Sequence, residues 1–303
     1  MNFKEFLAAG KEQLSAAGID PLDAEHLMAY VLGISRMDLH NPVVVEDRLA
    51  GFEDMTIVEE TFWKLLDARA AHQPLQYLTG VAYFRYLDIQ VGPGVLVPRP
   101  ESELLVQAVL DHCENNSEKL SGIISVVDLG SGSGALALAI STENPRTRVI
   151  AVEKDPAAIE WLKKNVSQIN EQVRIVESDV VDALEGVTCD VVIANPPYVP
   201  DSQELPRDVA DHEPAVALFG GPTGLDIPGR FIDTAARLLK PGGFFALEHT
   251  EDQGPHKYKF FLHGAIRGRR RETAIATQNI MNTRLTMANI PFYTKFRDIS
   301  NAF

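Results

Sequence analysis

The chain has 303 residues, of which 45% are hydrophobic and 23% charged, and its formal net charge is −14. This composition is typical of a folded globular protein long enough for two domains, and the acidic balance argues against binding to nucleic-acid phosphates. Cys113 and Cys189 lack metal-ligand spacing, the eight histidines form no metal-type cluster and no apolar stretch approaches about 18 residues, so we expect a cytoplasmic protein without a metal site, a disulfide framework or a membrane helix.

The first 73 residues are predicted to form a separate helical domain. Apolar residues recur at helical spacing in two stripes, which we interpret as packing faces: Phe3, Phe6, Leu7 and Leu14, then Leu27, Met28, Val31 and Leu32. Asp20 followed by Pro21 predicts the start of a second helix, with Asp20 as its N-cap. Thr56 and Glu59 have the spacing of a capping box, and a third helix is expected to run from there to about Ala71.

A strand, a glycine-rich loop and a helix are predicted between residues 123 and 140. Residues 123–127 form a short apolar run, and residues 135–140 favour a helix. The loop between them consists of Asp128, Leu129, Gly130, Ser131, Gly132, Ser133 and Gly134. Its glycines permit positive φ and allow a ligand to approach the backbone closely.

The next predicted strand ends on an acidic residue, as in nucleoside-binding sites. Residues 149–152 form its apolar run, and Glu153 follows 19 residues after Gly134. A carboxylate at this place can accept hydrogen bonds from both hydroxyls of a ribose. The GxGxG spacing is tighter than the GxGxxG dinucleotide fingerprint. This loop therefore favours S-adenosylmethionine over NAD as the cofactor.

Asn195-Pro196-Pro197-Tyr198 follows the apolar run of residues 191–194 and is the most informative motif in the chain. Proline fixes φ and restricts the residue before it, so Asn195 and Pro196 should be extended and stiff. The Asn195 side-chain oxygen and the Pro196 carbonyl can then accept hydrogen bonds from one NH₂ group and turn its nitrogen toward an incoming methyl. Tyr198 offers a flat face for stacking. The tetrapeptide alone is also compatible with a proline-rich turn after a buried strand.

Strands and helices alternate through the centre of the chain, which predicts an α/β fold with a mostly parallel, doubly wound sheet. Three helices and one further strand are expected around residues 104–109, 159–169, 232–239 and 244–247. Pro241-Gly242-Gly243 should end the last of these helices. Ligands of such sheets bind beyond the carboxyl ends of the strands, where the strand order reverses. The candidate residues at those ends are Gly130, Glu153, Asp179 and Asn195.

Together these motifs resemble the class I methyltransferases and, among them, the HemK/PrmC glutamine methyltransferases that act on peptide chain release factors. Further segments up to about Gly254 carry the resemblance: Pro74–Gly80, Phe84, Val95–Glu103, His212–Pro214, Ala217–Gly221 and Gly224–Asp226. Ser102 stands where the family usually has threonine, so a hydroxyl is kept. The resemblance implies a Rossmann-like methyltransferase domain at 98–254, a linker hairpin at 74–97 and an N-terminal helical domain at 1–73 that helps to bind the release factor.

The resemblance also implies a role for each candidate residue. The glycine loop, Gly130, Ser131, Gly132, Ser133 and Gly134, would line the methionine part of S-adenosylmethionine. Glu153 would hold its ribose and Asp179 would lie beside its adenine, where Val180 replaces an aromatic residue common in the family. Asn195, Pro196, Pro197 and Tyr198 would hold the substrate glutamine, with Asn195 also next to the cofactor. We expect direct in-line transfer without a dedicated general base.

Residues 255–303 differ from the rest of the chain in charge. They contain nine Lys and Arg against two Asp and Glu, whereas residues 1–254 contain 19 against 40. The family would have a helix and a closing pair of strands here, but the alternating apolar pattern is missing and residues 268–271 only faintly match the family's basic segment. We therefore hypothesise an altered reading frame or a recombined end at Pro255. Loss of the closing strands would leave the strand at 244–247 with an unpaired edge.

The sequence thus favours a release factor glutamine methyltransferase that uses S-adenosylmethionine. One alternative is a methyltransferase for an exocyclic amine of a nucleic-acid base, because adenine presents a similar NH₂ group and a ring for stacking. The net charge argues against that alternative, and only the basic tail offers a nucleic-acid contact. The other alternative is a catalytically silent cofactor-binding protein. The preferred release factor and the oligomeric state do not follow from the sequence.

Overall fold

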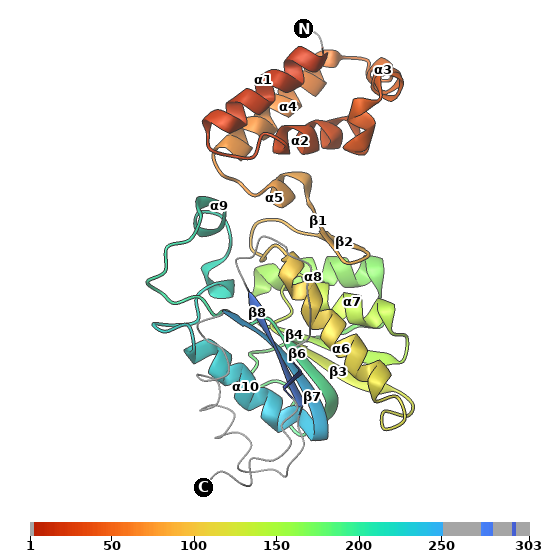
Figure 1. The fold of residues 1–303 in the computed structure, drawn as a ribbon, viewed down its shortest axis with the longest axis vertical. Helices are drawn as coiled ribbons and strands as arrows, with labels where there is room; N and C mark the ends of the chain where they lie inside the picture. Colours follow the sequence, from red (N-terminus) through yellow and green to blue (C-terminus); the bar gives the residue numbers. More distant parts are fainter. Residues whose placement is uncertain (1–2, 251–273, 281–292, 295–303) are drawn as a thin grey trace. The chain divides into compact units, whose positions relative to one another are not determined.

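The computed structural model describes residues 3–250, 274–280 and 293–294. The chain divides into two compact units (Figure 1). One unit consists of Met1–Val81 together with Leu205–Glu213, and the other of Ala82–Glu204 together with Pro214–Phe303. Residues 268–271 and the junction at Pro255 lie outside the described residues, so the hypothesis of an altered reading frame stays a prediction.

The first unit is helical, as the apolar stripes predict. Its helices are α1 Phe3–Ala16, α2 Asp23–Leu32, a 3-10 turn Met37–His40, α3 Pro42–Ala50, α4 Met55–Ala70, α5 Leu75–Thr79 and α9 Arg207–Ala210. The stripe residues Leu14, Leu27 and Leu32 are completely buried. The rings of Phe6 and Phe62 pack beside them with their centroids 5.2 Å apart. Burial of this shared apolar face holds the helices together.

Two predicted helix starts are wrong. The side chain of Asp54 accepts a hydrogen bond from the Thr56 N–H at 2.8 Å, so Asp54, and not Thr56, caps α4. Asp54 has the extended backbone that an N-cap needs, and its carboxylate satisfies a helix N–H that has no partner within the helix. Asp20 accepts from the Leu22 N–H at 2.9 Å within a preceding turn, and α2 begins only at Asp23.

Arg69 and Asp208 fasten the segment Leu205–Glu213 to the helices of the first unit. The Arg69 guanidinium donates to Asp23 at 2.7 Å, to Asp208 at 2.8 Å and to the Gln73 carbonyl at 3.1 Å. His72 Nδ1 lies 2.7 Å from the second carboxylate oxygen of Asp208. Burial alone would raise the pKa of Asp208, but the hydrogen bonds from His72 and Arg69 lower it. This buried cation thus joins Asp23 and Asp208, which lie 46 and 139 positions from it in the sequence.

The second unit contains a seven-stranded sheet with the order β5-β4-β3-β6-β7-β8-β9. Its strands are β3 Ile124–Leu129, β4 Thr147–Glu153, β5 Arg174–Glu177, β6 Cys189–Ala194, β7 Leu239–Thr250, β8 Ala274–Ile280 and β9 Tyr293–Thr294. All neighbours pair in parallel except β8 with β9. The chain moves outward from β3 to β5, returns to β6 and continues in the opposite direction. This reversal confirms the predicted doubly wound α/β sheet.

Helices cover both faces of this sheet (Figure 1). One face carries α6 Glu103–Asn115, α7 Ala135–Glu143 and α8 Pro156–Ile169, and the other face carries α10 Asp226–Leu238. A small hairpin precedes them, formed by β1 Val81–Phe84 and β2 Leu87–Gln90. The apolar runs of β3 and β6 are fully buried between the two helical layers, which explains why their sequences show no polar alternation.

The bounds of β3 and of α10 differ from the sequence prediction. β3 starts at Ile124, because Ile123 is 65% exposed, and it continues to Leu129. The helix α10 ends at Leu238, and residues 240–243 form an irregularity within β7, where the pairing with β6 shifts register.

The edge at 244–247, which loss of the closing strands would leave unpaired, is paired with another strand. β8 pairs in parallel with β7 from Phe244 to Thr250. Main-chain hydrogen bonds form this ladder, so the pairing does not require the alternating apolar pattern that residues 274–280 lack.

Cys113 and Cys189 are both buried and neither forms a disulfide. Burial raises the pKa of Cys113 to about 11 and that of Cys189 to about 12, which keeps both as thiols at neutral pH. Across residues 3–250 and the two short strands beyond them, no three His, Cys, Asp or Glu side chains gather as metal ligands. No described helix combines the length and the apolar character that crossing a membrane requires.

Asp128 is a completely buried acid near the end of β3. One of its carboxylate oxygens accepts from the Ala137 N–H at 3.2 Å, while the other is buried with no hydrogen-bond partner in the described structure. Burial, aided by the nearby charge of Glu153, raises the pKa of Asp128 to about 7. The folded protein therefore holds a proton on this carboxyl at a pH where the unfolded chain would release it.

We predict that Arg69→Ala destabilises the first unit by about 2 kcal/mol, because it leaves two acids beside an emptied, largely buried site. The value is below that of a fully buried pair since Asp208 is 35% exposed. Urea unfolding measures the change. Arg207→Ala is the matched control, because Arg207 forms an exposed pair with Asp211 and should leave stability unchanged. Equal losses in the two variants would contradict the role of Arg69.

We predict that the free energy of unfolding of Asp128→Asn increases relative to that of the parent as pH rises. The folded-state pKa of Asp128 lies above its unfolded value, so the parent loses stability between pH 4 and about pH 7, by up to about 1.4 kcal/mol per unit. The neutral amide removes this loss. Urea unfolding without cofactor at pH 5, 6, 7 and 8 should show the difference growing and then levelling above about pH 7. A difference that is constant over this range would contradict it.

Candidate active site

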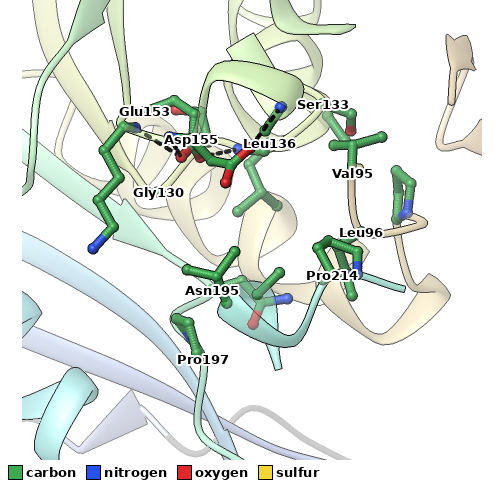
Figure 2. Close-up of a pocket in the computed structure, with 18 of the residues that line it drawn as sticks. Val95, Leu96, Gly130, Ser133, Leu136, Glu153, Asp155, Asn195, Pro197 and Pro214 are labelled. Atoms are coloured by element: carbon green, nitrogen blue, oxygen red, sulfur yellow. Dashed lines mark hydrogen bonds between the residues drawn. The ribbon is translucent and has the colours of Figure 1, made fainter. Parts of the chain in front are cut away.

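A cavity of about 210 Å³ lies where the strand order reverses, at the carboxyl ends of β3, β4 and β6. Figure 2 shows Glu153 and Asp155 together on one side of it, and Asn195 with Pro197 on another. The sequence-predicted residues in its wall are Gly130, Ser131, Gly132, Ser133, Glu153, Asp179, Val180, Asn195 and Pro197. The fold thus brings the candidate residues of four separate strands to one cavity.

The glycine loop turns sharply between β3 and α7. Gly130 has φ +68°, and a Cβ there would lie 3.0 Å from the Phe231 ring. Gly134 has φ +86°, and a Cβ there would lie 2.6 Å from the Leu162 side chain. Larger residues are therefore disfavoured twice, by backbone strain and by close packing. Gly134 directly precedes α7, while the other four loop residues line the cavity.

Glu153 ends β4 and ties the glycine loop to it. Its carboxylate accepts from the Gly132 N–H at 2.8 Å on one oxygen, and from the N–H groups of Lys154 and Asp155 at 2.7 and 2.9 Å on the other. A carboxylate offers about four acceptor positions, so these three bonds leave capacity for a ligand hydroxyl. The side chain is 9% exposed and belongs to the cavity wall.

Asp179 and Val180 follow β5 and form another part of the wall. Asp179 lies 3.1 Å from Lys154 Nζ and 3.2 Å from Arg230. Burial would raise the pKa of Asp179, but the hydrogen bonds from the Val181 N–H and Lys154 lower it, so the group is ionised at neutral pH. Val180 is 7% exposed and gives this end of the cavity an aliphatic surface.

Asn195 and Pro197 of the predicted amide-binding motif line the cavity directly after β6, whereas Pro196 and Tyr198 are not among the residues of its wall. Asn195 Nδ2 donates to the Ser102 hydroxyl at 3.1 Å. Pro196 is buried. The Tyr198 hydroxyl donates to Glu248 at 3.0 Å, and burial together with that carboxylate raises the pKa of Tyr198. The structure therefore gives Tyr198 a hydrogen-bonded hydroxyl in addition to the ring that the sequence offered.

The segment after Pro214 returns to the motif and packs along it. The Val199 N–H donates to Leu218 at 2.9 Å, and the Gly220 N–H donates to Val199 at 2.8 Å. A Cβ on Gly220 would lie 2.6 Å from the Pro197 carbonyl oxygen, so only glycine permits this approach. Pro214, Val216, Ala217 and Phe219 complete this side of the cavity.

Sequence reasoning missed several wall residues. Arg230 and Phe231 enter from α10, and Lys154 and Asp155 follow Glu153. Nothing in the local sequence of α10 distinguishes Arg230 and Phe231 from other positions near a helix start. Glu248, which lies behind Asn195 and not in the wall, was also missed, although an acid directly after the apolar run 244–247 carries the same signal that identified Glu153.

The arrangement combines acidic groups at one part of the cavity with amide and carbonyl acceptors at another. The first part offers carboxylate acceptors to a ligand rich in hydroxyls, and the second suits a planar NH₂ group. Both parts are supplied by strand ends and short loops of a packed α/β unit, which keeps their geometry fixed.

Two family models match the chain. The model described as the PrmC N-terminal domain matches residues 5–80, and the model described as the methyltransferase small domain matches residues 101–211. The first covers most of the helical unit, and the second contains the glycine loop, Glu153 and the Asn195 motif.

Curated relatives match over most of their length. The chain is 40% identical over 279 residues to the release factor glutamine methyltransferase of Bifidobacterium longum, which covers 86% of this chain and 91% of the relative. It is 39% identical to those of Streptomyces coelicolor and Mycolicibacterium smegmatis, covering 82% and 85% of this chain and 85% and 88% of the relatives. With such identity across both parts of the sequence, the chain belongs to the release factor glutamine methyltransferase family.

Proposed function

We infer that the chain transfers a methyl group from S-adenosylmethionine to the side-chain amide nitrogen of the glutamine in the Gly-Gly-Gln motif of peptide chain release factors. The observation that carries this inference is the position of Asn195, in the wall of a cavity that it shares with the glycine loop and Glu153. An acceptor for a planar amide thus lies in the same cavity as the features expected of a nucleoside site. Family membership supports the same substrate class.

The cavity fits S-adenosylmethionine. Gly130 has a positive φ and a Cβ there would lie 3.0 Å from the Phe231 ring, and Glu153 keeps acceptor capacity for a ribose hydroxyl. Asp179 with Val180 would hold the adenine end through a polar edge and an aliphatic surface. When bound, this cofactor supplies an electrophilic methyl group on a positively charged sulfur. The wall carries Glu153, Asp155 and Asp179 together with Arg99, Lys154 and Arg230, so its formal charges balance.

Asn195 and Pro196 would orient the substrate amide. The Asn195 side-chain oxygen and the Pro196 carbonyl accept the two N–H bonds of the glutamine, which restrains the nitrogen in the direction of attack. Amide nitrogen is a weak nucleophile, so restraint of this kind contributes to the transition state more than to general binding. Tyr198 would support this corner through its hydrogen bond to Glu248.

Formation of the N–CH₃ bond breaks the bond from sulfur to methyl, and the nitrogen then loses one proton. A protonated amide is strongly acidic, so water or the Asn195 oxygen suffices as the acceptor of that proton. No described acid needs to act as a dedicated general base. Orientation and charge matching therefore account for the main contributions of the protein.

The proposed function is tested with cofactor carrying a labelled methyl group. The chain is incubated separately with a release factor, with the same factor whose Gly-Gly-Gln glutamine is replaced, and with DNA or RNA. We expect label only in the intact release factor. Label in nucleic acid would favour the base methyltransferase, and cofactor binding without any transfer would favour the silent binding protein.

We predict that Asn195→Ala keeps the affinity for S-adenosylmethionine within roughly tenfold while most turnover is lost. The side chain touches the substrate amide, whereas the glycine loop and Glu153 hold most of the cofactor. Calorimetry gives the cofactor affinity, and transfer to the release factor gives kcat. Equal losses in both quantities would mean that Asn195 has a structural role.

We predict that Glu153→Gln weakens cofactor binding by roughly 10- to 100-fold. The new NH₂ group would face one of the backbone N–H donors that the carboxylate now accepts, and an acceptor for the ribose is lost. Glu160→Gln is the matched control, because Glu160 is an exposed residue of α8, the helix that follows β4. Calorimetric titration measures both variants, and similar affinities would contradict the role of Glu153.

A further inference from the structure

A buried hydrogen-bond chain lies behind Asn195. The Ser102 hydroxyl donates to Glu248 Oε2 at 2.5 Å, and Asn195 Nδ2 donates to the Ser102 oxygen at 3.1 Å. The Tyr198 hydroxyl donates to the other oxygen of the same carboxylate at 3.0 Å. Glu248 is 0% exposed and Ser102 is 4% exposed. Buried polar groups of this kind impose a defined geometry on one another.

The strands and the turn before α6 bring these groups together. Ala194 of β6 pairs with Leu247 of β7, so Asn195 and Glu248 follow at the same level of adjacent strands. Ser102 comes from the 3-10 turn Pro100–Ser102 that directly precedes α6. A serine far away in sequence is therefore placed against both strand ends, at residue separations of 93 and 146.

The direction of the hydrogen atoms along this chain follows from the available donors. A serine hydroxyl has one hydrogen, and it is donated to Glu248 because an ionised carboxylate can only accept. Toward Asn195, the Ser102 oxygen can then only accept. Asn195 must present its NH₂ group to Ser102, which places its side-chain oxygen on the other branch of the amide. If the amide were reversed, the Asn195 side-chain oxygen would face the Ser102 oxygen, and two acceptors cannot form a hydrogen bond.

We propose that Ser102 and Glu248 are positioning residues that fix the orientation of the Asn195 amide, so that its oxygen faces the substrate and an NH₂ group is selected as methyl acceptor. This assignment rests on the proposed function. An Asn195 amide turned the other way would present its own NH₂ to the NH₂ of glutamine. Two donors would then face each other, and the nitrogen would no longer be restrained for attack.

The test compares serine variants in the full chain. Ser102→Ala removes the link, and Ser102→Thr keeps a hydroxyl at the same position. Ser125→Ala is the matched control, because the Ser125 hydroxyl also donates to a carboxylate, that of Asp190, at 2.6 Å near the opposite end of β3 and β6. Each variant is assayed for kcat and KM with the release factor, for cofactor affinity by calorimetry and for urea unfolding.

We expect Ser102→Ala to lower kcat by roughly 30-fold, with KM for the release factor and the cofactor affinity changed by less than about threefold. Ser102→Thr should restore kcat to within about threefold of the parent. Ser125→Ala should leave kcat unchanged although it removes a similar bond. A loss of kcat in Ser125→Ala equal to that in Ser102→Ala would show a general structural effect and overturn the proposal.

Glu248→Gln tests the far end of the chain. Its amide can accept from only one of the two hydroxyls, so we expect a loss of roughly tenfold in kcat. If Glu248 acts through Ser102, adding Glu248→Gln to Ser102→Ala should cause little further loss. A parent-like kcat for Glu248→Gln, or losses that multiply in the double variant, would overturn the assignment of Glu248.

A readout that needs no release factor separates this proposal from the proposed function. The side-chain NH₂ signals of Asn195 are identified by their loss in Asn195→Ala and followed by nuclear magnetic resonance. Ser102→Ala should shift them and speed their exchange with water, whereas Ser125→Ala should not. If the parent methylates no release factor, the proposed function fails. If the Asn195 signals are the same in the parent and Ser102→Ala, the positioning role fails.

Discussion

The parallel pairing of β3 with β6 is the constraint on which the site depends. Leu129 pairs with Ala194, so the residues that follow them, Gly130 and Asn195, leave the sheet side by side. One begins the glycine loop and the other begins the proposed amide-binding corner. Because the chain reverses its direction of winding between these two strands, no crossover helix covers the gap. A change of register by one residue would reverse the faces of a whole strand and separate the two halves of the site.

Much of this arrangement could be predicted because the relevant signals are local. Positive φ at Gly130 and Gly134, the apolar run before Glu153 and the stiff Asn-Pro-Pro segment each depend on a few neighbouring residues. Element ends were less predictable, because competing caps decide them. The spacing of Thr56 and Glu59 pointed to Thr56, whereas the extended backbone of Asp54 and its hydrogen bond from the Thr56 N–H make Asp54 the N-cap. The pairing of β8 with β7 was missed because main-chain ladders leave a weak trace in the side-chain pattern.

The three buried acids at the carboxyl ends of the strands differ in the donors that surround them. Asp128 accepts one backbone hydrogen bond, from the Ala137 N–H, and burial raises its pKa to about 7. Glu153 accepts from three backbone N–H groups. Burial raises the pKa of Glu248, although hydrogen bonds from the Ser102 and Tyr198 hydroxyls and from the Asn195 side chain lower it. The sequence shows only three acids after apolar runs. Their different environments arise from loops and turns that are distant in the chain.

The choice of hydroxyl donors around Glu248 has a consequence for methyl transfer. A lysine or arginine in that place would hold the carboxylate more strongly, but it would also bury a further positive charge behind a cavity whose wall already contains Arg99, Lys154 and Arg230. Hydroxyl groups orient the carboxylate without that charge. They also transmit direction, because each carries a single hydrogen, whereas an ammonium group donates to several acceptors at once. In the proposed role, this relay of hydroxyl, carboxylate and amide decides which atom of Asn195 meets the substrate without adding a charge to the cavity.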